Sequence, residues 1–564
     1  MEDDYQTNTP ADTVAVQWDG EERLLPRGQT LEEILGPEQA LTDNPVVVAK
    51  VNHRIVELCY VPEDGDIITP LDLKSPEGNR ACQRGLLHLL VKATRAILPD
   101  SHLKVQSAID SGLYCEVISD APLDPFAVDR IGRKMREYVD HNAPFVRKLM
   151  DKSDAIALYQ DGKQPDKARL LAFREDKTFK VYSLEGYADY FYGHMPPSTG
   201  YLQRFRLIYE MPGLVLLYPR ASDPSAPFEF NTPRKLMHVF RESDHWANIL
   251  RCNTVADLNE LAQDEEKLNE FILINEARHD AETHDTAKAI EQSQARVVLI
   301  AGPSSSGKTT FTQKLRLQLR MRGKEPIMLS LDNYYIDRDK IPSQPDGSVD
   351  LENINTLDLD LFNEHLRALL DGQEVELPRF NFETARREPH SGRYLRLAPD
   401  DILLIEGIHG LNDSLTASVA SDQKFKIYIS ALTQLNLDYH NRISTTDVRL
   451  LRRLVRDYAS RDTNAEDTFQ MWPSVRAGEN RWIFPFQERA DVMFNSTLVY
   501  ELLYLKQKAV PLLAEISDES EFFSEANRLL KFLNYFITPP ESCAATIPNT
   551  SLLREFIGGG VFDR

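Results

Sequence analysis

Paired cysteines, excess positive charge and long apolar runs are all missing from this chain, and each absence excludes a class of protein. The five cysteines are scattered without a C-x-x-C pair, which excludes a disulfide framework or zinc knuckle and is typical of a reducing cytoplasm. A formal net charge of -22 disfavours non-specific binding to nucleic acid or anionic membranes. No apolar run can span a bilayer, and the acidic start, Met1-Glu2-Asp3-Asp4, is not a signal peptide. We therefore expect a cytoplasmic protein without membrane contact.

The chain does contain enough apolar material for several folded domains. Hydrophobic residues make up 42% of its 564 residues and charged residues 27%, as in ordinary globular proteins. Helical patterns at 257–291 and 521–536 carry no recognisable chemistry, and we expect them to serve packing. We divide the chain into residues 1–75, 76–230, a helical connector at 231–295, residues 296–515, and a helical tail at 516–564.

A phosphate-binding loop is the most informative motif. Gly302-Pro303-Ser304-Ser305-Ser306-Gly307-Lys308-Thr309 fits G-x-x-x-x-G-K-[ST]. Residues 296–301 read as a buried parallel strand before it, and residues 309–322 as a helix after it, with Gly323 as the cap. The glycines let backbone N–H groups approach phosphate oxygens, and the helix N-terminus favours an anion. The predicted nucleotide-binding residues are Gly302, Ser304, Ser305, Ser306, Gly307, Lys308, Thr309 and Thr310.

Two carboxylates are expected beside this loop. We expect Lys308 to reach the β- and γ-phosphates and the Thr309 hydroxyl to bind Mg²⁺. Asp332 follows a predicted strand at 326–331, and Glu406 follows another at 401–405. Ligands of open α/β sheets bind at the carboxyl ends of strands, where a carboxylate can accept the proton of an attacking hydroxyl. The alternative for Asp332 is a turn former at a strand end.

An arginine strip follows on a predicted helix. Arg449, Arg452, Arg453 and Arg456 are spaced to share one face, and Arg461 comes shortly after. A solvated basic face is the simplest interpretation. In an acidic chain with a phosphate loop, a lid that neutralises the transferring phosphoryl group is the better one.

These motifs resemble the uridine kinase and phosphoribulokinase superfamily, nearest to uridine/cytidine kinase. G-x-x-x-x-G-K-T, L-D-N-Y-Y, P-R-F-N-F, L-I-E-G and R-L-L-R-R-L-V-R-D occur in the family's order between residues 296 and about 496. The resemblance implies ATP as donor and Asp332 as the base for the 5′-hydroxyl of a nucleoside. It implies Mg²⁺ near Thr309, Asp332 and Glu406, and catalytic roles for Lys308, Arg453, Arg456 and Arg461. It also places Glu352 at the ribose hydroxyls.

The chain departs from this family where the base is read. Phe380 stands at a tyrosine position and Ala385 at a histidine position, Glu352 replaces a shorter Asp, and Thr463 replaces the last lid arginine. Loss of a hydrogen-bond donor from a buried site weakens discrimination between nucleoside bases. Arg386, Arg387 and Arg393 suit either a more anionic substrate or plain surface charge. We assign substrate contacts to Tyr335, Glu352, Phe380 and Arg449.

The first 75 residues predict a small β-grasp domain. Hairpins at 14–25 and 46–58 flank Thr30-Leu-Glu-Glu33, a capping box that opens a short helix. A final short strand is expected at Ile67-Ile68. Val48-Ala-Lys-Val-Asn52 and Glu63-Asp-Gly-Asp66 resemble the TGS domain of threonyl-tRNA synthetases. An unrelated small α+β module is the alternative.

Residues 76–230 resemble the second, editing-type domain of the same synthetases. We expect helices at 84–98 and 128–148 and strands at 170–173 and 214–218. The family's metal cluster is H-x-x-x-H followed by C-x-x-x-H, but here Lys92 follows His88 and Tyr190 precedes His194. A lysine ammonium repels a metal ion, so we predict no zinc and no editing hydrolysis. A retained pocket for an RNA end or an amino acid is the alternative.

The sequence thus predicts an α/β multidomain protein: a P-loop kinase domain with a parallel sheet, preceded by a β-grasp domain and an α+β synthetase-like domain. We expect ATP- and Mg²⁺-dependent phosphorylation of a nucleoside 5′-hydroxyl. The alternatives are a kinase for another sugar-like or phosphorylated small molecule, and an RNA- or ribosome-associated regulator with a nucleotide switch. RNA contact through the TGS-like domain and a homo-oligomer both stay open.

Overall fold

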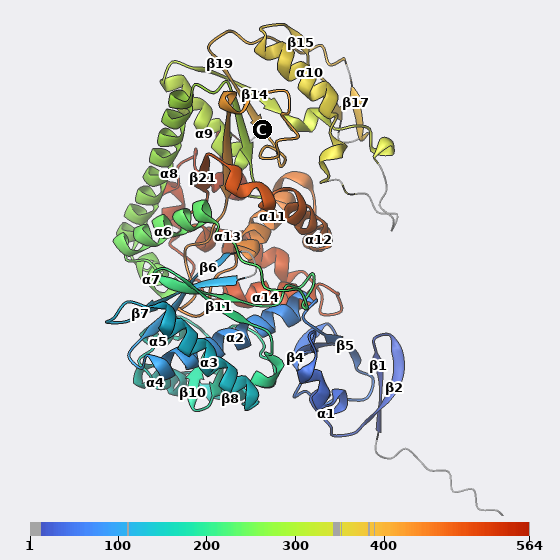
Figure 1. The fold of residues 1–564 in the computed structure, drawn as a ribbon, viewed down its shortest axis with the longest axis vertical. Helices are drawn as coiled ribbons and strands as arrows, with labels where there is room; N and C mark the ends of the chain where they lie inside the picture. Colours follow the sequence, from blue (N-terminus) through green and yellow to red (C-terminus); the bar gives the residue numbers. More distant parts are fainter. Residues whose placement is uncertain are drawn as a thin grey trace, which may run out of the picture.

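The computed structural model describes residues 13–109, 112–341, 350, 352–381, 384–388 and 390–562. The start Met1–Asp4 and Phe382 of the P-R-F-N-F motif lie outside these ranges. The molecule is elongated, with the β-grasp unit at one end and the P-loop sheet at the other (Figure 1). Within the described ranges, none of the helices combines the length and apolar character needed to cross a membrane.

The N-terminal unit is a five-stranded β-grasp sheet in the order β2-β1-β5-β3-β4. Alternation along the first strand buries Val14, Val16 and Trp18 against the helix side. The predicted capping box is confirmed, since Thr30 and Glu33 cap α1 reciprocally. The elements are β1 (Thr13–Trp18), β2 (Glu21–Pro26), α1 (Leu31–Leu35), η1 (Pro37–Leu41), β3 (Val48–Val51), β4 (Arg54–Glu57) and β5 (Ile67–Leu71).

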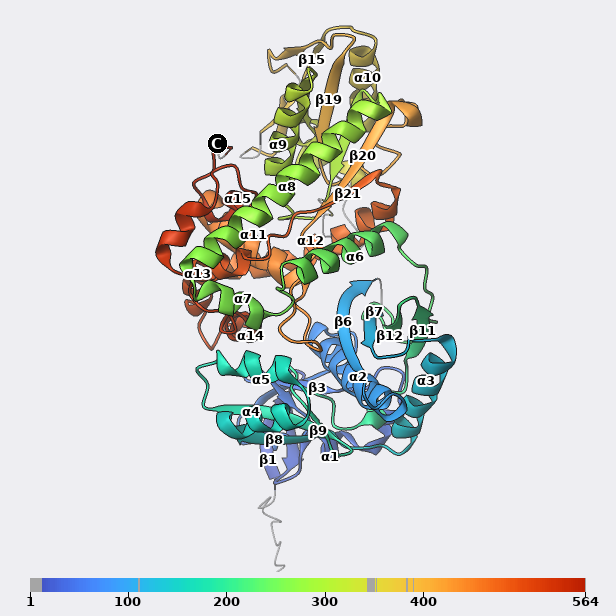
Figure 2. The same cartoon turned by 90° about the vertical axis from the view of Figure 1, so that its left-hand side faces the viewer.

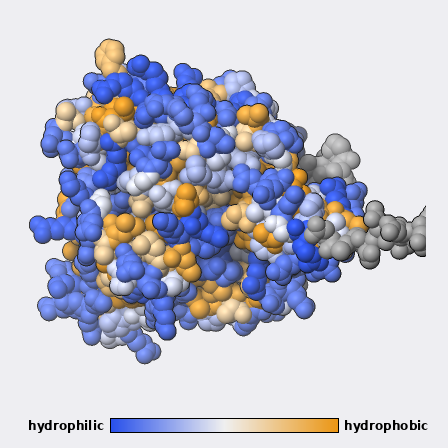
Figure 3. Space-filling model, turned by 90° about the horizontal axis from the view of Figure 1, so that it is seen from below, coloured by the Kyte–Doolittle hydropathy of each residue, from blue (hydrophilic) through white to orange (hydrophobic). Residues whose placement is uncertain are grey.

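The second unit packs helices on two antiparallel sheets, ordered β11-β12-β7-β6 and β10-β9-β8. Viewed from the end that carries this unit and the β-grasp unit, the surface of the molecule is mostly hydrophilic, with separate apolar patches around a hollow (Figure 3). The elements are α2 (Pro76–Ile97), β6 (His102–Ile109), β7 (Gly112–Ile118), α3 (Pro125–Asp140), β8 (Val146–Asp151), α4 (Lys152–Asp161), α5 (Pro165–Ala172), β9 (Thr178–Leu184), β10 (Tyr187–Asp189), η2 (Thr199–Tyr201), β11 (Arg206–Glu210) and β12 (Gly213–Leu217).

Two sequence-based predictions in this unit were wrong. Residues 170–173 are the end of helix α5 and not a strand. A short apolar run fits a buried helix as well as a strand, and Pro165 in the first turn favours the helix. The helix expected at 128–148 ends at Asp140. Asn142 adopts a left-handed φ of 50° and Pro144 follows, so the chain leaves the helix and continues as strand β8.

Helices connect this unit to the P-loop sheet. Asp257 and Thr254 form a capping box at the start of α7, and the helix expected over 257–291 is divided between α7 and α8. Figure 2 shows α8 running past α9, with the tail helices α13 and α15 gathered on one side of it. The elements are α6 (Arg234–Ile249), α7 (Val255–Ala262) and α8 (Glu265–Ser293).

The P-loop unit is a five-stranded parallel sheet in the order β14-β19-β13-β20-β21. All five residues of β13 are buried, as expected for a strand covered on both faces. From β13 the chain first adds β14 and β19 on one side of this strand and then β20 and β21 on the other side. The crevice at the carboxyl ends of β13, β14 and β19, where the side changes, is therefore the expected ligand site. The main elements are β13 (Val297–Ala301), α9 (Lys308–Met321), β14 (Glu325–Ser330), η3 (Leu331–Tyr334), α10 (Leu359–Leu370), β19 (Asp401–Glu406), β20 (Lys424–Ser430), α11 (Thr445–Arg461), α12 (Ala465–Trp482) and β21 (Val492–Asn495).

Small hairpins and a C-terminal tail complete the fold. The tail folds back so that α15 packs on α11 and η8 packs on α8, and it shares one hydrophobic core with the second unit and the P-loop helices. These elements are β15 (Val375–Glu376), β18 (Tyr394–Leu395), β16 (Arg379–Asn381), β17 (Arg386–Glu388), α13 (Glu501–Ala514), α14 (Phe523–Leu533), η8 (Glu541–Thr546) and α15 (Arg554–Ile557).

A buried ion cluster joins the second unit to the P-loop unit. The Lys167 ammonium lies 2.8 Å from Asp189 and 2.9 Å from Asp438, and all three side chains are fully buried. The His440 ring, from the loop after β20, contacts the other oxygen of Asp189 at 2.8 Å. Although burial opposes its charge, the neighbouring aspartates raise the pKa of Lys167 well above its usual value. The charges therefore compensate one another across the junction.

Replacing Lys167 by methionine is expected to lower the free energy of unfolding by about 3–5 kcal/mol, because two buried carboxylates lose their cation. Lys163→Met is the matched control, since Lys163 is 76% exposed and its loss should change stability by at most about 0.5 kcal/mol. Urea unfolding of the full chain measures both. Equal transitions for the two variants would show that the cluster does not stabilise the junction.

Candidate active site

The phosphate loop has the backbone shape that its sequence predicts. Gly307 adopts a φ of 83° and Ser305 a φ of 57°, which turn the chain sharply from β13 into α9. A side chain at Gly302 would lie 2.0 Å from the Ile429 carbonyl oxygen, so only glycine fits there. The loop therefore directs the N–H groups of the first α9 turn outward, where they can bind an anion.

Lys308 folds back over its own loop. Its ammonium donates to the carbonyl oxygens of Gly302 at 2.9 Å and Pro303 at 3.1 Å. Burial lowers the pKa of Lys308, and the carboxylates of Glu406 and Glu555 oppose that shift. The positive charge is thus available at the mouth of the loop.

Asp332 and Glu406 lie at the ends of adjacent parallel strands. Glu406 is the last residue of β19, pairs in register with Ser330 of β14, and accepts a 3.3 Å hydrogen bond from Thr312. Asp332 follows β14 in the η3 turn and is exposed. Burial raises the pKa of both carboxyl groups, and the Lys308 ammonium opposes the shift in both. The two carboxylates thus share one electrostatic environment with Lys308.

This oxygen set suits a divalent cation. Thr309 is the second residue of α9, and its side chain is exposed beside Lys308. Mg²⁺ prefers one or two carboxylates together with hydroxyl, water and phosphate oxygens. Thr309, Asp332 and Glu406 would therefore hold Mg²⁺ here.

Three arginines of α11 donate hydrogen bonds to the phosphate loop. Arg449 donates to the Ser304 carbonyl at 3.0 Å, Arg452 to the Ser305 carbonyl at 3.4 Å, and Arg453 to the Ser304 hydroxyl at 3.0 Å. Arg449 and Arg452 are 1% and 0% exposed. Arg449 was expected to contact substrate, but its burial under the loop makes it a support of the loop instead.

Three buried acids near these arginines were missed from the sequence. Glu479 of α12 pairs with Arg449 and accepts the Ser304 N–H at 2.9 Å. Glu501 pairs with Arg452. The 1%-exposed Asp457 contacts Arg453 at 3.1 Å, Arg456 at 2.7 Å and Arg461 at 3.5 Å. Asp457 lies four residues from both Arg453 and Arg461, a helical pair spacing that could have indicated its role.

Several residues expected to bind the acceptor have neighbours that the structure describes. The Tyr335 and Phe380 rings meet edge to face with centroids 5.6 Å apart. Burial raises the pKa of Glu352, and the positive charges of Lys308 and Arg453 oppose this rise. Gly478 has no side chain, which leaves room for that of Glu352. Arg387 pairs with Asp358 at 2.8 Å, and this pairing favours the surface-charge interpretation for that arginine.

The residues at the synthetase-like metal positions have other surroundings. His88 is buried among the rings of Phe145, Tyr187 and Phe191, and burial lowers its pKa to about 4. Lys92 donates to the Glu185 carbonyl at 2.8 Å. Across the described ranges, no group of three or more His, Cys, Asp or Glu side chains is arranged to hold a metal ion.

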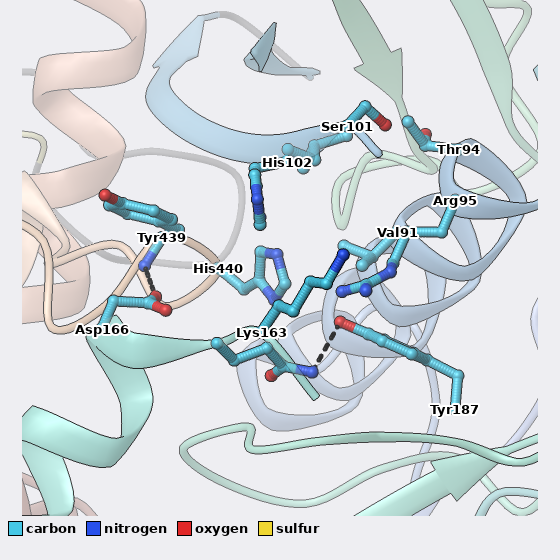
Figure 4. Close-up of a pocket in the computed structure, with 12 residues that line it drawn as sticks. Val91, Thr94, Arg95, Ser101, His102, Lys163, Asp166, Tyr187, Tyr439 and His440 are labelled. Carbon is cyan, nitrogen blue, oxygen red and sulfur yellow. Dashed lines mark hydrogen bonds between the residues drawn. The ribbon is translucent and has the colours of Figure 1, made fainter. Parts of the chain in front are cut away.

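A small pocket lies where the second unit meets the loop after β20 (Figure 4). The rings of His102 and His440 face its interior, and Asp166 accepts the Tyr439 N–H at 2.9 Å. Its volume of about 10 Å³ suits roughly one water molecule. A nucleoside cannot enter a pocket of this size.

Two regions of the chain are similar to known proteins. Residues 297–501 match the phosphoribulokinase / uridine kinase family. A uridine kinase of Halobacterium salinarum is 28% identical over 196 residues, which are 34% of this chain and 77% of that protein. A uridine kinase of Anoxybacillus flavithermus is 27% identical over 198 residues, which are 35% of this chain and 84% of that protein.

The N-terminal region has a different relative. A threonine–tRNA ligase of Pelobacter propionicus is 26% identical over 190 residues, which are 34% of this chain. The match spans only 30% of the ligase. The chain therefore carries a kinase domain of the phosphoribulokinase / uridine kinase family behind an N-terminal region similar to part of the threonine–tRNA ligases.

Proposed function

We propose that this chain is an ATP- and Mg²⁺-dependent kinase that phosphorylates the 5′-hydroxyl of a nucleoside. One observation carries the proposal: Asp332 is exposed at the carboxyl end of β14, beside the strand that ends in Glu406, and within the electrostatic influence of Lys308 and Arg461. A nucleotide switch needs no such carboxylate, whereas phosphoryl transfer to a hydroxyl does.

In this proposal each group has a defined task. The N–H groups of the loop and the Lys308 ammonium bind and orient the donor phosphates. Asp332 accepts the proton of the acceptor hydroxyl while that oxygen bonds to the γ-phosphorus of ATP. At the same time the bond between the γ-phosphorus and the bridging oxygen breaks, and ADP leaves. Arg453, Arg456 and Arg461, held together by Asp457, stabilise the charge on the transferring group. Bound Mg²⁺ would neutralise phosphate charge.

The acceptor assignment rests on Glu352 and Phe380 and on the similarity to uridine kinases. We assign Glu352 to the sugar hydroxyls on the similarity to uridine kinases, and its electrostatic neighbours Lys308 and Arg453 put it beside the donor-site residues. Phe380 offers the base an aromatic face without a hydroxyl donor, so we assign a nucleoside without naming its base. A different sugar-like or phosphorylated acceptor is the alternative within the same chemistry.

Replacing Asp332 by asparagine should lower kcat by about 10²–10⁴-fold, since the general base is lost. ATP binding should be spared, because the loop and Lys308 are untouched. Asp339→Asn is the control, as Asp339 is an exposed aspartate of a short nearby helix. Monophosphate formation from Mg-ATP and a nucleoside panel measures the effect. If no nucleoside is phosphorylated and ATP turnover is equal in wild type and Asp332→Asn, the kinase proposal fails.

The pH dependence follows from the raised pKa of Asp332. Burial raises this pKa above its ordinary value of 3.8, and only the ionised carboxylate can accept a proton. kcat/KM should therefore fall on acidification with a midpoint above 3.8. A pH profile over the range in which circular dichroism shows the chain folded tests this. A kcat/KM that stays constant on acidification down to pH 3.8 would exclude Asp332 as the base.

The similarity of the N-terminal region to threonine–tRNA ligases favours a second candidate, an RNA- or ribosome-associated regulator. The net charge of -22 weakens it, because RNA binding rewards positive charge. Under the kinase proposal we expect the chain to purify at low salt without RNA, as judged by its absorbance ratio and by gel staining. Stoichiometric tRNA or ribosomes in the purified material would instead support the regulator.

A further inference from the structure

The C-terminal tail places a carboxylate on the phosphate loop. Glu555 of α15 accepts hydrogen bonds from the Thr310 N–H at 3.2 Å and the Thr310 hydroxyl at 2.8 Å. Thr310 is in the first turn of α9, where N–H groups lack helical partners. The residue before the helix is Gly307, which has no side chain to cap it. Glu555 supplies that cap from 245 residues away.

Two neighbours of Glu555 also pack on the loop region. The Leu552 side chain lies so close to Gly307 that a Cβ there would be 2.8 Å from it. The Phe556 ring lies 4.8 Å from the guanidinium of Arg452, the arginine that donates to the Ser305 carbonyl. One turn of the tail therefore covers the loop at its junction with α9.

The charge of Glu555 acts on the same groups that a nucleotide would meet. Burial lowers the pKa of Lys308 and of Arg461, and the Glu555 carboxylate is among the charges that oppose this lowering. Burial raises the pKa of Glu406, and repulsion by Glu555 adds to that rise. A carboxylate and a phosphate are both anions that accept N–H groups at a helix N-terminus. The Thr310 N–H can serve only one of them fully at a time.

Different features flank Glu555 on its two sides in the tail. Ser551 anchors it through a 2.5 Å hydrogen bond to the buried Glu276 of α8. On the other side, Gly558 and Gly559 adopt φ values of 84° and 79°, a backbone that glycine reaches without strain. Ser551 thus fixes the chain before Glu555, and two glycines with positive φ follow it.

We propose that Glu555 is an autoinhibitory stand-in for a donor phosphate, and that the nucleotide must displace it from Thr310 to bind. The inference rests on the proposed kinase function, because it names the regulation of that donor site. The apparent affinity for nucleotide is then reduced by the fraction of molecules in which Glu555 is bound. A partner that pulls the tail from the loop would activate the enzyme without touching the acceptor site.

The test is binding of Mg-ADP to the full chain by titration calorimetry. Glu555→Gln keeps the shape and removes the charge, and Glu555→Asp keeps the charge on a side chain too short to reach Thr310. Both should bind Mg-ADP about tenfold more tightly than wild type, since a charge-assisted competitor is weakened or lost. Glu541→Gln, at an exposed tail position, should bind like wild type. Thermal melting checks that all variants are folded.

The outcomes separate this inference from the kinase proposal. Equal Mg-ADP affinity in wild type and both Glu555 variants overturns the inference and leaves the kinase proposal standing. Weaker binding by both variants also overturns it, because Glu555 would then complete the nucleotide site. Tighter binding without phosphorylation of any acceptor supports the inference and counts against the kinase proposal. Absence of Mg-ADP binding in every variant refutes both.

Discussion

The unpaired N–H groups at the start of α9 are the constraint on which the rest of the P-loop unit depends. They exist because Gly302, Ser305 and Gly307 turn the chain directly from β13 into the helix, and no local side chain caps it. Uncapped helix donors need an acceptor. In this structure the Glu555 carboxylate accepts the Thr310 N–H of this turn, and Glu479 accepts the N–H of Ser304 in the loop before the helix. In the proposed reaction the acceptors are phosphate oxygens.

Such a site must also balance its charges without substrate. The buried arginines of α11 are each paired, Arg449 with Glu479, Arg452 with Glu501 and Arg453 with Asp457. An unpaired buried charge would be far more costly than an exposed one. The same helix therefore supports the loop through hydrogen bonds to its carbonyl groups and brings Arg456 near Lys308 and Arg461 near Asp332. Loop support and phosphate stabilisation are two tasks of one helix.

The parallel strands and the phosphate loop could be predicted because local patterns determine them: five apolar residues before Gly302 and a helical pattern after Thr309. Asp332 and Glu406 could be placed because strand ends of one sheet meet at one edge. The partners Glu479 and Glu555 could not, because each reaches the loop from a distant segment and leaves no local spacing. Residues 170–173, at the end of the helix 165–172, were misread as a strand because a short apolar run has no decisive period.

In the proposed regulation one backbone donor, the Thr310 N–H, alternates between the Glu555 carboxylate and a nucleotide phosphate. A crystal structure of the full chain with Mg-ADP tests this alternation. We expect a phosphate oxygen within hydrogen-bond distance of the Thr310 N–H, with the Glu555 carboxylate displaced from it. A bound Mg-ADP with Glu555 still on Thr310 would contradict the claim.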